Sequence, residues 1–183
     1  GSATIRPDTK MGYEACLQAL EHPATAMGNV GAGTGATVGK LCGMERASKT
    51  GIGCYAMALG ELQVAAVVVV NALGDIFDPV NGTKIAGLMN EDRTAFGDSC
   101  EELWKLGCPQ NLFTGNTTIG AVITNGQFNK AQMNKIASMT RNAYARCINP
   151  VGTMADGDSI YAASIGDVKA DINVVGTLAA HVM

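Results

Sequence analysis

The order of apolar and polar residues in the first half of the chain predicts one helix and two strands. Residues 11–21 carry apolar side chains at helical spacing and predict a helix that ends near Pro23. Residues 51–59 and 61–70 predict two strands. The second of these is a continuous apolar run, which is typical of a strand that is buried on both faces.

The second half of the chain predicts a surface excursion followed by alternating strands and helices. Turn-forming pairs such as Asp78-Pro79, Asn81-Gly82 and Cys108-Pro109 place the excursion over residues 78–111, with a short helix around 100–106. The elements expected after it are a buried strand over 119–123, a helix over 130–147, a strand over 156–161 and a helix over 171–181. This alternation predicts the α/β class, in a single domain that spans residues 1–183 and contains no internal repeat.

Composition narrows the possible functions. The 183 residues are 47% hydrophobic and carry a net charge of -3, so we expect a globular protein that binds neither nucleic acid nor a membrane surface. The longest apolar run, residues 64–70, is too short to cross a bilayer. Six cysteines lie without a CxxC pair and the two histidines lie far apart, so we expect no metal, no cofactor and a cytoplasmic protein with free thiols.

The glycine-rich run over residues 31–39 invites comparison with a phosphate-binding loop. It lacks that motif, because Thr34 stands where the first glycine is required and Leu41 follows Lys40. The run is therefore interpreted as tight turns and close backbone approach. Lys40 has two interpretations, a solvated loop lysine or a cation that reaches a functional site.

Three further segments carry candidate chemistry. Thr117 and Thr118 follow Asn116 at the start of a strand, where they are either ordinary β-formers or a hydroxyl nucleophile. Asp156 and Asp158 form either a solvated turn or a carboxylate pair on one strand face. Asn71, at the end of a strand, is either a turn former or an amide donor to an oxyanion.

Taken in chain order, these motifs resemble those of the DmpA-type aminopeptidases, a family that includes β-peptidyl aminopeptidases and the nylon-oligomer endohydrolase. The motifs are Gly28 to Gly35 with Gly39-Lys40, Val70-Asn71, Asn116 to Ile119, and Asp156-Gly157-Asp158. The resemblance implies an αββα sandwich of the type shared with ornithine acetyltransferases, here lacking its N-terminal part. It also implies a precursor that cleaves itself, substrates that are small peptides or amides, and assembly into homo-oligomers.

The same resemblance assigns roles to individual residues. It places the cut between Asn116 and Thr117, which gives fragments 1–116 and 117–183 and leaves Thr117 as the N-terminal nucleophile. Asn71 is implied in the oxyanion hole, Lys40 near the nucleophile, and Asp156 and Asp158 as orienting carboxylates. One departure is Gly152, where members of the family usually carry a histidine.

Reference pKa values favour the Thr117 α-amine over Lys40 as the base for the hydroxyl. An α-amine titrates near 8 and a lysine near 10.4, and this gap of about 2.5 units makes the unperturbed α-amine far more often neutral at pH 7. Two other functions stay open: acyl transfer as in ornithine acetyltransferases, and a structural unit without a competent site. The sequence leaves the substrate open among L-peptides, D-amino-acid amides, β-peptides and synthetic oligomers.

Overall fold

A four-stranded sheet forms the centre of the computed structural model, which describes residues 4, 6–22, 26–107 and 115–183. Its strands are β3 (Ile52–Leu59), β4 (Leu62–Val69), β7 (Ile119–Gly126) and β9 (Ser159–Val168), in the order β3-β4-β7-β9. β4 is antiparallel to both β3 and β7, whereas β7 and β9 are parallel. The carboxyl end of β4 and the amino ends of β7 and β9 therefore meet at one edge of the sheet.

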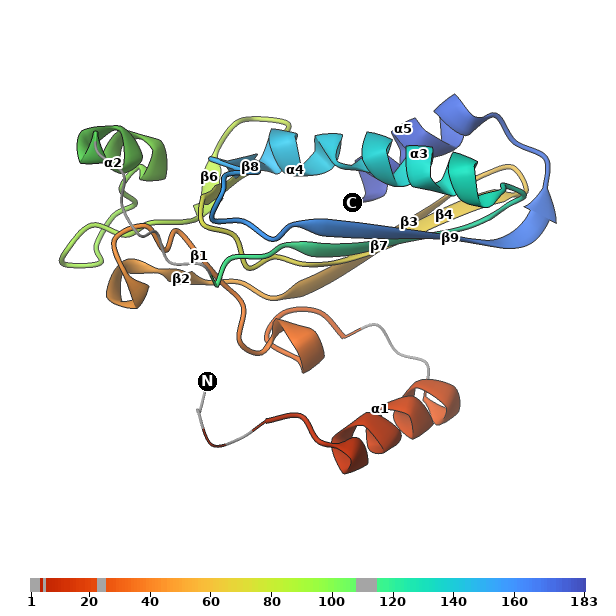
Figure 1. Ribbon diagram of the computed structural model, residues 1–183, viewed down its shortest axis with the longest axis horizontal. Coiled ribbons are helices and arrows are strands. Elements are labelled where there is room, and N and C mark those ends of the chain that lie inside the picture. Colours follow the sequence, from red (N-terminus) through yellow and green to blue (C-terminus); the bar gives the residue numbers. More distant parts are fainter. Residues whose placement is uncertain (1–3, 5, 23–25, 108–114) are drawn as a thin grey trace.

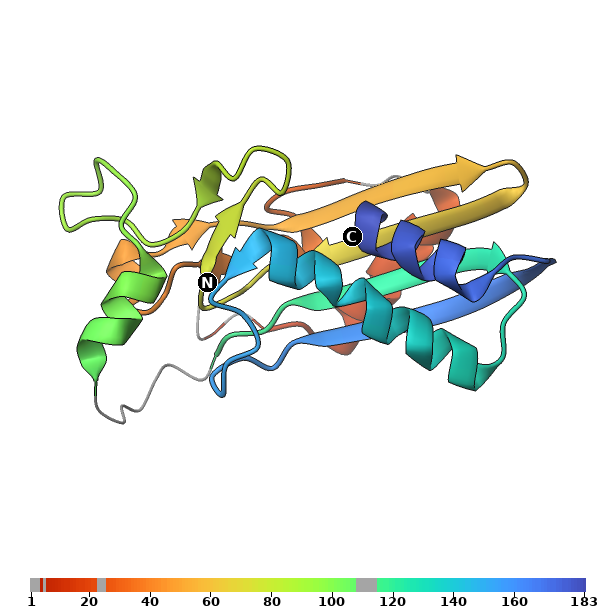
Figure 2. The ribbon, with the colours of Figure 1, turned by 90° about the horizontal axis from the view of Figure 1, so that it is seen from above.

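Three helices cover one face of this sheet: α3 (Lys130–Thr140), α4 (Asn142–Cys147) and α5 (Ile172–Val182) (Figures 1 and 2). Alternate residues of a strand point to the same face, so every second residue of β4 from Leu62 to Ala66 is buried against the helices. The core that results also contains Val122 of β7, Ile136 of α3 and Val175 and Ala179 of α5.

The opposite face of the sheet is open among the described residues. Ile119, Ile123, Tyr161 and Ile165 are 38% to 73% exposed there. Helix α1 (Thr9–Glu21) lies on this side but has no buried residue (Figure 1). The expectation that strand 61–70 is buried on both faces is therefore wrong, because described parts of the chain pack against only one face.

A smaller group of elements lies beyond the edge of the main sheet where the ends of β4, β7 and β9 meet (Figure 1). It consists of the pair β1 (Thr37–Val38) and β2 (Ser48–Lys49), the sheet of β5 (Asp75–Phe77), β6 (Lys84–Ala86) and β8 (Ile148–Asn149), and α2 (Ser99–Leu106). Buried Asp75 links β5 to β6 and α2: its carboxylate accepts hydrogen bonds from Leu88 N and from the N–H and hydroxyl of Ser99, and pairs with Lys84 at 2.7 Å. The expected excursion is thus anchored to the fold; its residues 108–111 lie outside the described part of the chain.

The predicted α/β class is confirmed, with two local corrections. The expected helix over 130–147 is divided at Arg141, next to Thr140, whose hydroxyl donates to Ile136 O at 2.8 Å. Such back-bonding by a β-branched residue bends helices. The expected strand over 156–161 begins at Ser159, so Asp156 and Asp158 precede β9.

Candidate active site

Thr117 lies where the ends of β4, β7 and β9 meet, and its peptide bond to Asn116 is held on both sides. Its hydroxyl donates to Asn116 O at 2.6 Å, and its N–H donates to the main-chain oxygen of Asn71 at 2.9 Å. Gly157 N donates to the same Asn116 oxygen at 2.8 Å. The side chain of Asn116 is fully buried. The carbonyl that would have to be attacked therefore has a hydroxyl and an N–H donor beside it.

Lys40 is buried in this site, which excludes the interpretation as a solvated lysine. Its residue is 2% exposed, and its Nζ donates to the main-chain and side-chain oxygens of Asn71 at 2.9 Å each. The preceding Gly39 has a φ of +66°, and a Cβ on it would lie 1.9 Å from Leu88 N. Only glycine fits this backbone. The glycine-rich run thus supports close backbone approach, as expected.

Burial lowers the pKa of Lys40 to about 8, and the negative charge of Asp156 opposes the shift. Removing an ammonium group from water penalises its charged form. The pKa of Lys40 therefore comes close to the reference value of an α-amine. Reference pKa values therefore no longer favour the α-amine over Lys40 as the base.

Asn71 follows β4, and its side-chain amide contacts Thr37 and Lys40 at one end and the segment before β7 at the other. Its Oδ1 accepts from Lys40 and from Thr37 N at 3.2 Å, and its Nδ2 donates to Gly115 O at 2.9 Å. The amide donor is thus directed at the carbonyl one residue before Asn116. In the uncleaved chain the Asn116 carbonyl accepts from the Thr117 hydroxyl and the Gly157 N–H instead.

The two carboxylates lie beside the Thr117 segment in a stretch that keeps the register of β7 and β9, with Asn116 opposite Asp156. Asp158 Oδ1 accepts from Thr118 N at 2.8 Å. Burial raises the pKa of the Asp158 carboxyl, the hydrogen bond from Thr118 opposes this shift, and the charge of Asp156 adds to it. Asp156 Oδ2 accepts from the N–H and hydroxyl of Thr153, so it is fixed by its own loop.

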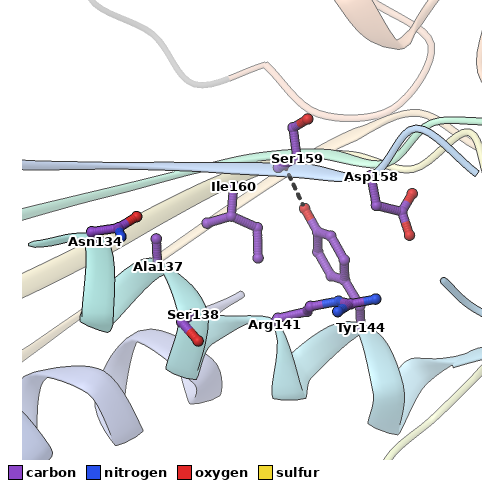
Figure 3. Close-up of a pocket in the computed structure, with 8 residues that line it drawn as sticks. All are labelled: Asn134, Ala137, Ser138, Arg141, Tyr144, Asp158, Ser159 and Ile160. Atoms are coloured by element: carbon purple, nitrogen blue, oxygen red, sulfur yellow. Dashed lines mark hydrogen bonds between the residues drawn. The ribbon is translucent and has the colours of Figure 1, made fainter.

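A cavity of about 220 Å³ opens on the helix side of the site, between α3, α4 and the start of β9. Of the predicted site residues only Asp158 lines it. Tyr144 stands beside Asp158 and donates to Ser159 O at 3.4 Å (Figure 3). Burial raises the pKa of Tyr144, and the charge of Asp158 adds to this effect. The cavity therefore adjoins Asp158 rather than the Thr117 hydroxyl.

All five residues expected at the site are brought together at this edge: Thr117, Asn71, Lys40, Asp156 and Asp158. Sequence reasoning missed the N–H of Gly157 and the main-chain oxygen of Asn71, since backbone groups leave no mark on residue type. The one available signal was the glycine between the two aspartates. Nowhere in the described ranges do three or more His, Cys, Asp or Glu side chains gather as metal ligands.

Comparison with solved structures identifies the fold. The structure resembles an L-aminopeptidase/D-Ala-esterase/amidase from Ochrobactrum anthropi, whose fold is described as a variant of the Ntn hydrolase fold. The TM-score is 0.56 at 16% identity, over 86% of this chain and 42% of that one. The protein thus has the fold of this aminopeptidase, as the sequence predicted, and its described residues supply the four-stranded main sheet and the helices on one face of it.

The family follows from the sequence: the model of peptidase family S58 matches residues 4–182, and the chain belongs to this family. It is 33% identical to an uncharacterized aminopeptidase of Mycobacterium leprae over 93% of this chain and 47% of the relative. It is 30% identical to a 6-aminohexanoate-oligomer endohydrolase of Agromyces sp. over 91% and 47%. The predicted membership of the DmpA-type family is confirmed, and the chain spans about half the length of these relatives. Among the described helices, none is long and apolar enough to cross a membrane.

Proposed function

We propose that the protein is a self-processing amide hydrolase that uses Thr117 first to cut its own chain and then, as the new N-terminus, to cleave small peptides or amides. The observation that carries this proposal is the 2.6 Å hydrogen bond from the Thr117 hydroxyl to Asn116 O, beside the buried amine of Lys40. Membership of a peptidase family supports the same reaction class.

In the self-cleavage step, Thr117 Oγ forms a bond to the Asn116 carbonyl carbon. Neutral Lys40 takes up the hydroxyl proton and returns it to the Thr117 nitrogen as the bond between that nitrogen and Asn116 breaks. Lys40 Nζ lies near the scissile bond, since Nζ and Thr117 N both donate to the main-chain oxygen of Asn71 at 2.9 Å. Water then hydrolyses the resulting ester and releases the Asn116 carboxylate.

In the hydrolase step, the free α-amine of Thr117 serves as the base for its own hydroxyl, as in other N-terminal nucleophiles. The hydroxyl attacks an amide carbonyl of the substrate and forms an acyl-enzyme, while the amine leaves with the proton taken from the hydroxyl. Water then hydrolyses the ester, releases the acid and restores the Thr117 hydroxyl. Asn71 Nδ2 donates to the oxyanion, and Asp156 and Asp158 orient the surrounding cations and N–H groups. Since one relative is named for 6-aminohexanoate oligomers, the substrates proposed here are aminoacyl amides and short amide oligomers.

The mass of the denatured chain tests the self-cleavage. Fragments of 116 and 67 residues are expected from the parent chain, and a single 183-residue chain from Thr117→Ala. Thr117→Ser keeps the hydroxyl and is the matched control, which should still cleave. Cleavage after Asn116 in the Thr117→Ala variant would exclude Thr117 as the nucleophile.

Release of the chromophore from aminoacyl p-nitroanilides tests the hydrolase step on the cleaved protein. Addition of an amine acceptor such as glutamate separates hydrolysis from acyl transfer. Hydrolysis predicts product formation that does not depend on the acceptor. If turnover required the acceptor, the reaction would be acyl transfer.

A further inference from the structure

We propose that Gly157 is a catalytic residue of the self-cleavage step. Its N–H stabilises the oxyanion formed during self-cleavage, whereas the side-chain amide of Asn71 stabilises the oxyanion formed during substrate hydrolysis. Gly157 serves the scissile carbonyl of the uncleaved chain, whereas the Asn71 amide becomes available only after cleavage. This inference rests on the proposed self-cleavage and assigns a new residue to it.

The N–H of Gly157 is placed to stabilise the oxyanion of self-cleavage. It donates to Asn116 O at 2.8 Å, the oxygen on which negative charge develops when Thr117 attacks. The register of the parallel pair fixes this contact, because Asn116 bridges to Asp156 and Ile119 pairs with Ser159. A backbone donor held by strand pairing is preorganised and needs no rearrangement as charge develops.

The missing side chain of Gly157 is a second requirement of the same step. A Cβ on this residue would lie 2.8 Å from Thr117 Oγ and 3.6 Å from Asn116 O. The first distance is below van der Waals contact. A Cβ at this distance requires a shift of the Thr117 hydroxyl from its position beside the carbonyl it has to attack. An alanine here therefore displaces the nucleophile and leaves the backbone contact in place.

Asn71 is unsuited to the same task before cleavage, because its Nδ2 is already directed at Gly115 O at 2.9 Å. Cleavage after Asn116 frees the segment that ends with Gly115 and Asn116 to leave the site. Departure of that segment exposes the Asn71 amide to a substrate carbonyl. The uncleaved segment thus acts as an internal inhibitor that occupies both donors.

The test is the rate of fragment formation, followed by denaturing mass spectrometry from the moment of refolding. Gly157→Ala is expected to slow cleavage by about 100-fold or more, the usual effect of displacing a nucleophile by an ångström. Gly53→Ala is the matched control, since a Cβ at Gly53 has nothing within 4 Å, and its rate should equal that of the parent. Asn71→Ala should slow cleavage less than Gly157→Ala does, because it removes one acceptor of Lys40 Nζ but keeps the main-chain oxygen that holds Thr117 and the Gly157 N–H that donates to Asn116 O.

The outcomes separate this assignment from the proposed function. If the parent cleaves, Thr117→Ala does not, and Gly157→Ala cleaves at the parental rate, then a side chain at position 157 is tolerated and the steric requirement is wrong, while Thr117 stays the nucleophile. If Asn71→Ala blocks cleavage as fully as Thr117→Ala, the assignment of different oxyanion donors to the two steps is wrong. This conclusion holds even if Gly157→Ala fails to fold. Circular dichroism of each variant reports folding. Failure of the parent itself to cleave overturns both proposals.

Discussion

At the scale of single residues, Lys40 gives the site a pH dependence. Its lowered pKa of about 8 means that the amine is mostly protonated at pH 6 and mostly neutral at pH 9. If the neutral amine accepts the Thr117 proton, the self-cleavage rate should rise about tenfold per pH unit below 8 and become constant above it. The rate of fragment formation, measured by mass spectrometry on samples quenched at successive times across pH 6 to 10, gives this profile.

Two substitutions identify the titrating group. Lys40→Met removes the amine, and Lys40→Arg replaces it with a group that stays charged throughout this range. Both should cleave slowly and lose the inflection near pH 8. An unchanged inflection in Lys40→Met would assign the titration to another group.

The Asn71 side chain is expected to matter for turnover after cleavage. Removal of one oxyanion donor costs a factor of about 100 to 1,000 in comparable sites. Asn71→Ala should therefore lower kcat for a p-nitroanilide by about that factor in the cleaved protein. Asn173→Ala, on the exposed first turn of α5, is the matched substitution and should leave kcat unchanged. Equal kcat in both variants would remove Asn71 from the site.

Residue types and their order predicted which side chains gather at the site, but not how they are held. Asn71, Lys40 and Thr117 lie far apart in the sequence, so their shared contacts depend on the strand pairing. The lowered pKa of Lys40 has the same origin, because burial is a property of the assembled fold. The role of the Gly157 N–H could not be predicted from the N–H itself, since every residue except proline carries one; only the glycine between the two aspartates marks the position.

At the scale of elements, the N-caps of two helices should contribute unequally to stability. Asp171 caps α5 by accepting from Asn173 N and Val174 N, and α5 contributes buried residues to the core. Asp171→Ala should lower the free energy of unfolding by about 1 kcal/mol. Asp8 caps α1 in the same way, but α1 has no buried residue, so Asp8→Ala should leave global unfolding unchanged. Urea denaturation followed by circular dichroism compares the two, and equal losses would show that α1 packs on the fold.

Most elements were predictable because a local pattern specifies them. Helix α2 and strands β3, β4 and β7 lie within a few residues of their expected bounds. The predictions that were wrong concern features that depend on tertiary contacts. The apolar run of β4 predicted cover on both faces, but which faces are covered depends on distant segments. The division at Arg141 follows the buried Thr140, whose hydroxyl donates to Ile136 O, a contact that residue type alone does not predict.

At the scale of the whole molecule, the sheet connects the two parts that self-cleavage would create. β3 and β4 belong to residues 1–116, whereas β7, β9 and the covering helices belong to residues 117–183. Residues 64–69 of β4 pair with 119–124 of β7 across the cut. The core is shared as well, since Leu62 and Val64 pack in one cluster with Val122, Ile136 and Val175. Neither fragment contains a complete core.

We therefore expect the two fragments to stay together after cleavage. On size exclusion in native buffer they should elute as one species, and the denatured sample should contain masses for 116 and 67 residues. Val64→Asp, which buries a charge at a position 1% exposed, should weaken this association and release the fragments separately. Gln63→Asp places the same charge on the neighbouring exposed position and should leave the fragments together. Separation of the fragments in the unsubstituted protein would mean that the pairing of β4 with β7 does not outlast the covalent link.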